Sequence, residues 1–446
     1  MATYAHGDTS LFTYNRFGMF IHWGLYSMPA RHEWIRNYEQ ITNEDYQKYF
    51  DYFNPDLFNP AEWAKTAREA GMKYVVFTTK HHEGFCMFDS KYTDYKVTNT
   101  PYGKDIVRQV VDAFRAEGLR IGFYYSLIDW HHPEFPVDKL HPLASRYPDE
   151  KRGEINKNRH MKKYAQYMRD QVTELLTNYG KIDIIWFDFS YPSPVEAAEG
   201  KRKYGFPHCY YGKDHNDWES VKLLKTVRSL QPDIIIDNRL DLEGAGDIMT
   251  PEQFTPDKPL VGKDGRPVVW EGCQTFSGSW GYHRDEQTWK TTKQCIDMLV
   301  NHVSRGGNLL MNVGPTSRGY WDYRALACLK GYADWMKYNS RAIYGCGQAP
   351  EGLKAPADCR YTYNAQTKRL YLHLMNWPFK HVTLAGMAGK VAYAQFLHDG
   401  SEIRMREGKP DTDMPLDEKG GAGELILELP VIKPPVEVPV VELILK

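Results

Sequence analysis

The sequence predicts an α/β fold: a (β/α)8-like TIM barrel followed by a C-terminal antiparallel β-sandwich domain. Over most of the 446 residues, apolar runs of strand length alternate with amphipathic helical patterns, which is typical of a parallel barrel. From about Ile343 onward the pattern changes to short segments that alternate between apolar and polar residues, which is typical of a sandwich. We therefore expect the barrel to span residues 1–344 and the sandwich residues 345–446.

Eight apolar runs are expected to form the barrel strands, and a closed barrel needs this number. They cover, in chain order, residues 17–23, 74–78, 121–126, 182–188, 233–237, 247–249, 268–273 and 309–313. The link between Asp237 and Met249 leaves no room for a full helix, so we expect the barrel to be irregular there. Asn308 and Asn312, near the eighth run, are interpreted as polar groups with satisfied hydrogen bonds.

The clearest helix signal lies between the first two runs, where Asn59 can cap a helix, Pro60 occupies its first position and Gly71 ends it. The other expected helices cover residues 158–179, 217–230, 287–304 and 324–338. The last sandwich segment contains three prolines within residues 434–439. Because proline donates no ladder hydrogen bond, we expect an edge strand there.

Composition excludes some classes of partner. The formal net charge is −1 and the pI is near 7.0, which predicts no binding to nucleic acid or to an anionic membrane. Aromatic residues make up 14% of the chain, with 12 Trp and 31 Tyr. Exposed aromatic faces suit sugar rings, but an aromatic-rich core is the alternative that composition alone favours.

The cysteines and the N-terminus bear on location. The seven cysteines are widely spaced and form no CxxC pair, which predicts neither a disulfide framework nor a zinc site. The first residues contain no basic n-region and no apolar h-region, and no apolar run is long enough to cross a bilayer. We expect a cytoplasmic protein, or a secreted or periplasmic one if a signal peptide had been removed. The oligomeric state stays open, and a homo-oligomer is one option.

Polar side chains stand at the ends of several expected strands. The run 182–188 ends on Asp188, where the hydrophobic pattern would take another Val or Ile. Other runs end near His22, His81, His82, Tyr125 and Asp129. Parallel barrels build their active sites from groups at the carboxyl ends of their strands, so we expect these side chains to share one site.

Two carboxylates are the minimum for hydrolysing a glycoside. Asp188 is the best candidate for the nucleophile, with a capping or salt-bridging role as the alternative. For the acid, Glu252 lies in a loop after the sixth run and Glu271 at the end of the seventh. Partial burial against aromatic residues raises the pKa of such a group. Both glutamates can meet that condition, so the residues alone leave the choice open.

The histidines His22, His81 and His82 can hold sugar hydroxyls, and tryptophans can frame the apolar side of a sugar ring. The tryptophans considered for this are Trp23, Trp34 and Trp280. A metal site is the competing interpretation, but no HxH, HExxH or matched carboxylate triad occurs, so we expect no metal. A hydrogen-bonded structural pair is the alternative for the two adjacent histidines.

Taken together, these residues resemble the retaining α-L-fucosidases of glycoside hydrolase family 29. The segments that carry the resemblance are, in order, RFGMFIHWGLYSMPARHEW, MKYVVFTTKHHEGFCMFDSKYTDY, GFYYSLIDWHHPEF, IDIIWFDFS, IIIDNRL, WEGCQTFSGSWGY and GGNLLMNVGPTSRG. They run from about Asn15 to Tyr344, and the C-terminal region is similar to the family's β-sandwich. Seven motifs in one order are specific, where no single motif would be.

The resemblance implies removal of terminal α-L-fucose with retention, a fucosylated oligosaccharide or glycoconjugate as substrate, and no metal or organic cofactor. Asp188 matches the nucleophile of the WFD motif, and Trp186 matches the aromatic residue before it. The residues that match or resemble sugar ligands are His22, Glu33, His81, His82 and Tyr125, with Tyr124 as the alternative to Tyr125. Arg239 is similar to the arginine that follows the family's fifth strand.

The resemblance also bears on the acid/base. Glu252, in a TPE segment, resembles the acid/base of several members and is favoured over Glu271. Two other functions stay open. One is a related exo-glycosidase, such as a galactosidase or another deoxyhexosidase. The other is a non-catalytic sugar-binding barrel, which the pair of carboxylates disfavours.

Overall fold

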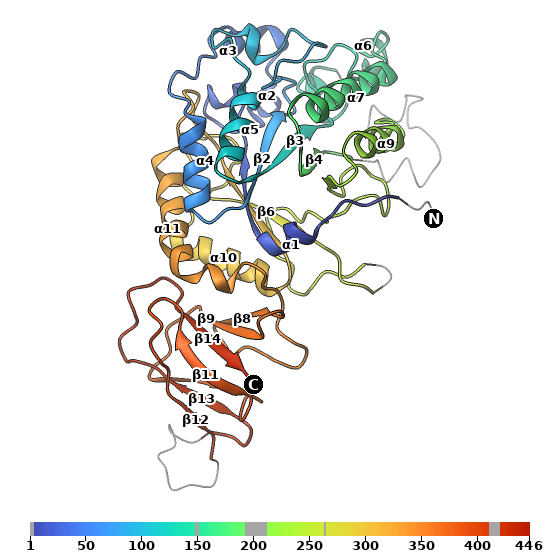
Figure 1. The fold of residues 1–446 in the computed structure, drawn as a ribbon. Helices are drawn as coiled ribbons and strands as arrows, with labels where there is room; N and C mark the ends of the chain where they lie inside the picture. The colour runs from blue at the N-terminus through green and yellow to red at the C-terminus, as the bar shows by residue number, and fades with distance from the viewer. Residues whose placement is uncertain (1–3, 148–150, 192–211, 263–264, 410–419) are drawn as a thin grey trace.

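The computed structural model of the protein describes residues 4–147, 151–191, 212–262, 265–409 and 420–446. Its larger part is a curled sheet of parallel strands in the order β5-β4-β3-β2-β1-β7-β6, with helices around the outside (Figure 1). The strands are β1 (Phe17–Ile21), β2 (Tyr74–Lys80), β3 (Arg120–Ser126), β4 (Ile184–Asp188), β5 (Ile235–Ile236), β6 (Glu271–Thr275) and β7 (Asn308–Val313). The predicted α/β barrel is confirmed, and within the described residues its sheet has seven regular strands instead of eight.

Isolated bridges span the gap between β5 and β6. Asp237 pairs in parallel with Ile248, and Met249 pairs in parallel with Trp270. The expected sixth strand is therefore present only as bridges, and the predicted irregularity is confirmed. The seventh expected strand was placed too early, because β6 begins at Glu271. This shift moves Glu271 from the expected end of a strand to its beginning.

The helices follow their capping signals. They are α1 (Ser10–Asn15), α2 (Ile35–Tyr38), α3 (Asn43–Asp51), α4 (Pro60–Glu69), α5 (Ile106–Ala116), α6 (Arg152–Ile155), α7 (Met161–Asn178), α9 (Ser220–Leu230), α10 (Thr292–Ser304) and α11 (Tyr323–Asn339). As predicted, Asn59 caps α4 by accepting the N–H of Glu62. The expected helix over 287–304 begins later, because Thr291 and Gln294 form a reciprocal capping box there.

Alternate residues of each strand face opposite sides of the sheet. The barrel interior holds a cluster that includes Phe20, Tyr74, Val76, Tyr124, Ile184, Trp186, Cys273 and Leu310. Their sequence neighbours, such as Val75, Tyr125 and Ile185, belong to the larger cluster that packs under the helices. Asp188 follows Ile184 and Trp186 at the same two-residue spacing and so faces inward.

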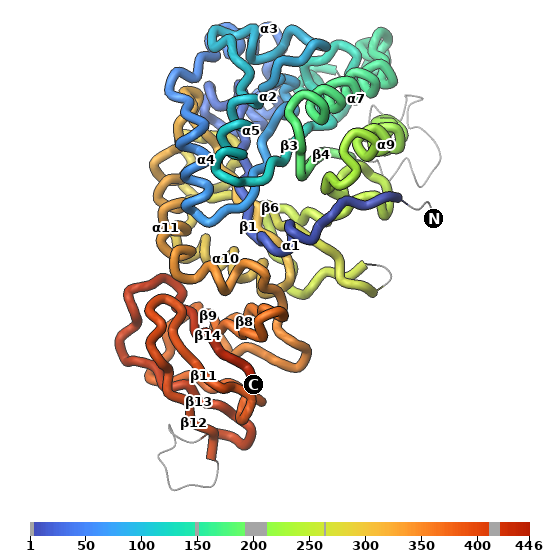
Figure 2. Tube along the Cα trace, in the orientation of Figure 1, coloured from blue at the N-terminus to red at the C-terminus, as the bar shows by residue number. Residues whose placement is uncertain are grey.

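The N-terminal segment runs across the amino ends of the strands toward α9 (Figure 2). The backbone N–H of Asp8 donates to the carbonyl of Asp233 (3.2 Å), and that of Gly7 donates to the Asp247 carboxylate (2.9 Å). The segment therefore ties the irregular part of the barrel to the first strands.

Two antiparallel sheets form the predicted sandwich, with orders β10-β13-β12 and β11-β14-β9-β8, below α10 and α11 in Figure 1. The strands are β8 (Cys359–Asn364), β9 (Arg369–Leu374), β10 (His381–Leu384), β11 (Val391–Phe396), β12 (Met405–Glu407), β13 (Leu425–Glu428) and β14 (Val440–Leu445). The edge-strand prediction was wrong, because β14 lies between β11 and β9. The prolines at 434–439 all precede Val440 and remove no ladder donor. The division at residues 344 and 345 stays a prediction.

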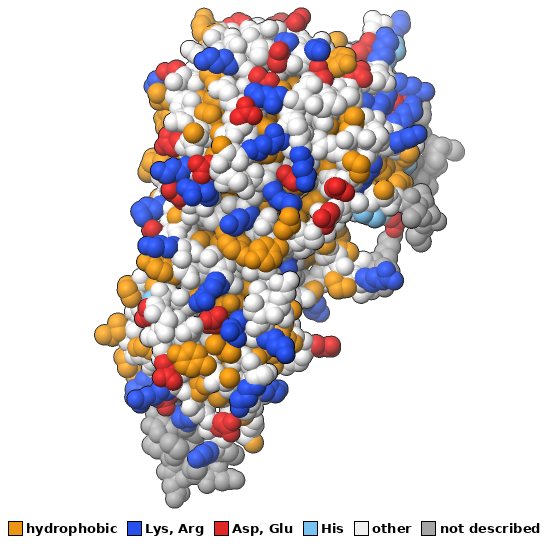
Figure 3. All heavy atoms as spheres, in the orientation of Figure 1, with side chains coloured by type: hydrophobic (Ala, Val, Ile, Leu, Met, Phe, Trp, Pro, Cys, Tyr) orange, Lys and Arg blue, Asp and Glu red, His pale blue; other side chains and the backbone are white. Residues whose placement is uncertain are grey.

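The distribution of surface charge agrees with the nearly neutral composition. Positive and negative side chains are interspersed over the face shown in Figure 3. No helix within the described ranges is long and apolar enough to cross a membrane. The six cysteines in these ranges are free and buried, and Cys209 lies outside them.

Candidate active site

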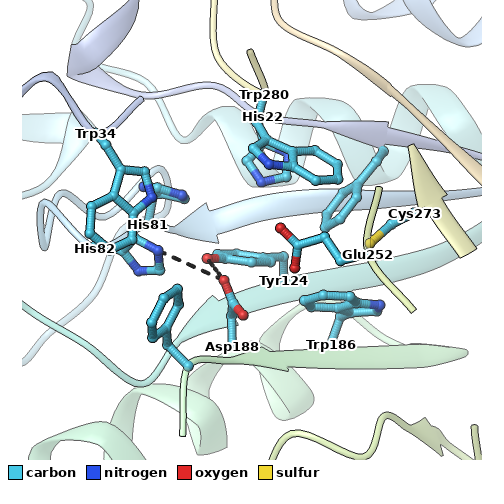
Figure 4. Close-up of a pocket in the computed structure, with 12 residues that line it drawn as sticks. His22, Trp34, His81, His82, Tyr124, Trp186, Asp188, Glu252, Cys273 and Trp280 are labelled. Atoms are coloured by element: carbon cyan, nitrogen blue, oxygen red, sulfur yellow. Dashed lines mark hydrogen bonds and ion pairs between the residues drawn. The ribbon is translucent and has the colours of Figure 1, made fainter. Parts of the chain in front are cut away.

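A pocket opens at the carboxyl ends of the barrel strands (Figure 4). Its empty volume is about 320 Å³, part of it open to solvent. The lining residues are Phe20, His22, Trp34, His81, His82, Tyr124, Trp186, Asp188, Phe189, Glu252, Cys273 and Trp280. The structure therefore brings eight of the sequence-predicted site residues into one pocket.

Asp188 lies at the floor of the pocket and accepts two hydrogen bonds. The hydroxyl of Tyr124 donates to its Oδ2 (2.7 Å), and Arg239 Nη1 donates to its Oδ1 (2.8 Å). Burial raises the pKa of Asp188 above its ordinary value, while the Arg239 charge and the Tyr124 hydrogen bond oppose that rise. The two donors thus stabilise the anion that a nucleophile requires.

Arg239 joins the two candidate catalytic carboxylates. Its Nη2 donates to Glu252 Oε2 (2.7 Å) and its Nε donates to Thr250 Oγ1 (3.1 Å). The guanidinium also lies over Trp186, 4.3 Å from the ring centroid. Since one planar group contacts Asp188 and Glu252 together, it fixes their relative position. The Glu252 side chain is 41% exposed against 11% for Asp188, so solvent reaches the glutamate more easily.

The three histidines are neutral at pH 7. Burial lowers the pKa of His22 and of His82 to about 3, and that of His81 to well below its ordinary value. A neutral imidazole has one donor and one acceptor nitrogen, and a neighbouring group selects which is which. These side chains are therefore hydrogen-bonding ligands for neutral hydroxyls and do not act as charges.

Neighbouring groups fix two of the histidine tautomers. His22 Nδ1 lies 2.7 Å from Asn312 Oδ1, an atom that can only accept, so this nitrogen carries the proton. Ser126 donates its hydroxyl to the carbonyl of Ile128 (2.7 Å), so it accepts from His82 Nδ1 (2.6 Å). The Nε2 atoms of both histidines are left as acceptors. That of His82 lies 3.8 Å from Asp188 Oδ2.

The other predicted ligands differ in their placement. Trp34 and Trp280 line the pocket, whereas Glu33 is buried outside its lining. Glu33 Oε2 accepts the backbone N–H groups of Trp280 (3.1 Å) and Gly281 (2.9 Å), and burial raises the pKa of Glu33 to about 7. Its contacts hold the segment that carries Trp280. Trp23 is fully buried in the core, where its indole N–H donates to Thr316.

Tyr125 and Glu271 lie outside the pocket. Tyr125 faces the helices, donates to Gln171 on α7 (2.8 Å) and packs beside Lys80. Glu271 is fully buried at the amino end of β6, where it accepts a hydrogen bond from Tyr74, the first residue of β2. A strand of five residues is about 13 Å long, so Glu271 and Asp188 occupy opposite ends of the barrel interior.

Four lining residues were missed or left as alternatives: Phe20, Tyr124, Phe189 and Cys273. A two-residue spacing from Phe20 to His22, and from Trp186 to Asp188, was the available signal for inward-facing positions. The interpretation of Asn312 as a satisfied polar group is confirmed, since its amide also donates to the carbonyl of Trp280 (2.6 Å). The Asn312 side chain also orients His22, because its Oδ1 accepts from His22 Nδ1.

The chain turns sharply after Asp188. Phe189 has a φ of 82°, a left-handed conformation that a bulky residue adopts only where its surroundings enforce it. The turn places the Phe189 ring 5.1 Å from His82 and 5.4 Å from Trp34, between ring centroids. These three rings form one wall of the pocket.

Comparisons with known proteins agree with this geometry. Residues 5–341 match the family model described as alpha-L-fucosidase. The chain belongs to the α-L-fucosidase family. It is 30% identical to the plasma alpha-L-fucosidase of Pongo abelii over 81% of this chain and 75% of that protein. The alpha-L-fucosidase isoenzyme 1 from Paenibacillus thiaminolyticus superposes with a TM-score of 0.86 at 42% identity, covering 98% of each chain.

A further solved structure bears on stereochemistry. It is a family 29 α-L-fucosidase from Bacteroides thetaiotaomicron, a covalent intermediate trapped with 2-fluoro-fucosyl fluoride. Its TM-score is 0.80 at 28% identity, and the match covers 100% of this chain and 98% of that one. A covalent intermediate is the mark of a retaining mechanism. The predictions of a glycoside hydrolase and of a retaining α-L-fucosidase are confirmed.

Proposed function

We propose that this enzyme removes terminal α-L-fucose from oligosaccharides or glycoconjugates, with Asp188 as nucleophile and Glu252 as acid/base. The observation that carries this assignment is the Arg239 guanidinium, which contacts both carboxylates at the floor of the pocket. Glu271 is not a partner for Asp188, because it lies at the other end of the barrel interior. Hydrolysis with retention requires two carboxyl groups that reach the same glycosidic bond.

In the first step fucose occupies the pocket, with its hydroxyls held by the histidines. The Nε2 atoms of His22 and His82 accept hydroxyl protons, and Trp186 offers an apolar face to the methyl group at C5. Asp188 attacks the anomeric carbon and forms an ester bond as the glycosidic bond breaks. Glu252 gives its proton to the leaving oxygen.

In the second step water resolves the glycosyl-enzyme. Glu252, now a carboxylate, takes a proton from the water while the water oxygen attacks the anomeric carbon and Asp188 leaves. The greater exposure of Glu252 suits this role, since water must reach it. Arg239 and Tyr124 stabilise the Asp188 carboxylate as it is released. Glu33 acts as a positioning residue for Trp280.

Two variants test the acid/base assignment. We expect Glu252→Ala to lower kcat/KM by about 10² to 10⁴-fold on aryl fucosides with poor leaving groups and much less on activated ones. Added azide should restore turnover of an activated fucoside and give fucosyl azide of retained α configuration. Glu271→Gln is the matched control and should show neither effect. The assignment is wrong if the Glu271 variant shows this pattern and the Glu252 variant does not.

A further inference from the structure

A second hollow opens beside the catalytic pocket. Its empty volume is about 790 Å³, part of it open to solvent. It is lined by Phe189, Ser190, Asn238, Arg239, Asp241 and Glu252. Phe189 and Glu252 line the catalytic pocket as well, so the two spaces share a wall. A group that departs on the side of Glu252 therefore enters this hollow.

The hollow offers one amide donor group. Asn238 Oδ1 accepts both the backbone N–H (3.1 Å) and the hydroxyl (3.0 Å) of Thr250. These bonds fix the orientation of the amide. Asn238 is an exposed residue, and its Nδ2 has no hydrogen-bond partner among the described residues. The NH₂ group is thus held in place with its two protons available.

The hollow also offers a carboxylate acceptor. Asp241 Oδ2 accepts the backbone N–H of His215 (3.1 Å) and lies 3.2 Å from its Nδ1. The other oxygen has no hydrogen-bond partner in the described part of the chain. Asp241 has a φ of 54°, a left-handed conformation that Asp tolerates better than most residues. The hydrogen bond from the His215 backbone orients the carboxylate.

Charge and ring content limit what can bind. Arg239 already contacts two carboxylates and Thr250, so it offers no free cation to an anionic ligand. Asp241 and Glu252 repel negative charge. Phe189 is the one aromatic side chain among the lining residues, so hydrogen bonds to hydroxyls outweigh stacking here. These properties fit a neutral sugar and disfavour an acidic one.

We propose that this hollow is the leaving-group subsite, which binds the neutral hexose or N-acetylhexosamine unit to which fucose is attached. Asn238 donates to one hydroxyl of that sugar, and Asp241 accepts from another. This inference rests on the proposed assignment of Glu252, because it assumes that the leaving oxygen departs past that residue. It makes Asp241 a specificity-determining residue for the leaving group and not for fucose.

The test compares substrates that differ only in the leaving group. The variants are Asp241→Ala and Asp241→Asn, with Asp112→Ala, on the exposed face of α5, as control. For each variant, kcat/KM is measured on three substrates. They are 4-nitrophenyl α-L-fucoside, a disaccharide of fucose and a neutral hexose, and a disaccharide in which a hexuronic acid replaces that hexose. We expect Asp241→Ala to lower the ratio of disaccharide to aryl activity by about 10-fold, as for the loss of a hydrogen bond to a charged group.

The acidic disaccharide supplies an independent readout, and it is applied to the conservative variant, which should keep the fold intact. In Asp241→Asn the shape is preserved and one charge is removed, so cleavage of the acidic disaccharide should rise relative to the neutral one. Unchanged ratios in both Asp241 variants, in an enzyme that cleaves all three substrates normally, would overturn the subsite alone. If Glu252→Ala also lacked azide rescue, the assignment of the acid/base would fail first.

Discussion

The two ends of the barrel interior contain the same pair of groups in different surroundings. At the carboxyl ends of the strands, Tyr124 donates to Asp188, and at the amino ends Tyr74 donates to Glu271. Both carboxylates belong to buried residues. Only the pair at the carboxyl ends has a cation, because Arg239 contacts Asp188, whereas no ion pair to Glu271 occurs within the described residues.

The difference shows what separates a nucleophile from a structural acid. Burial raises the pKa of Glu271 to about 7, and its Oε1 has no hydrogen-bond partner among the described residues. At Asp188 burial acts in the same direction, but Arg239 and Tyr124 oppose it. Both buried carboxyls accept a tyrosine hydrogen bond, but the Arg239 guanidinium, which has no counterpart at Glu271 among the described residues, favours the ionised form of Asp188 that can attack.

Replacement of Asp188 should have the largest effect on activity. We expect Asp188→Asn to lower kcat on aryl fucosides by about 10⁴-fold or more, because the amide cannot form the glycosyl ester. Steady-state kinetics and circular dichroism would show an inactive, folded enzyme. A variant that retained a tenth of the activity would contradict the assigned nucleophile.

Removal of the tyrosine hydroxyl should have different effects at the two ends of the barrel. Tyr124 lowers the pKa of Asp188, and attack requires the ionised form, so Tyr124→Phe should raise that pKa. The acid limb of kcat/KM against pH should then move about one unit to higher pH. Tyr74→Phe is the matched control and should lower the melting temperature without moving the limb. Equal shifts in both variants would remove the distinction between the ends.

The smallest effect is expected for Glu271→Gln, which should keep near-normal activity. Because the folded-state pKa of Glu271 is raised to about 7, the contribution of this group to stability is present below its unfolded pKa and is lost as pH rises through about 7. The variant lacks this loss. Its free energy of unfolding relative to wild type should therefore increase between pH 5 and pH 8, as measured by denaturant titration at several pH values. A constant difference would show that Glu271 is ionised throughout.

Much of the site was predictable because strand ends carry its chemistry. Asp188 and His22 interrupt apolar runs, and this pattern alone predicts that both lie at the carboxyl ends of barrel strands. Glu271 was misplaced because the apolar residues before it were interpreted as strand. A shift of three residues in the start of a strand moves a side chain about 10 Å along the barrel.

The choice between Tyr124 and Tyr125 failed for a related reason. Both are large and buried, and the sequence does not say which one faces inward. The pairing of β3 with β2 and β4 decides this, and it places Tyr124 beside Trp186 inside the barrel. Arg239 was predicted as a motif residue, but its bridge between two carboxylates depends on the irregular segment after β5. Such long-range contacts have no local signal.

The central claim is that Asp188 is the carboxylate that bonds to fucose. The most direct measurement is mass spectrometry of the enzyme after reaction with 2-fluoro-fucosyl fluoride, followed by proteolysis and peptide sequencing. Our account predicts one 2-fluoro-fucosyl group per chain, on Asp188. An adduct on Glu252, Glu271 or any other residue would contradict it.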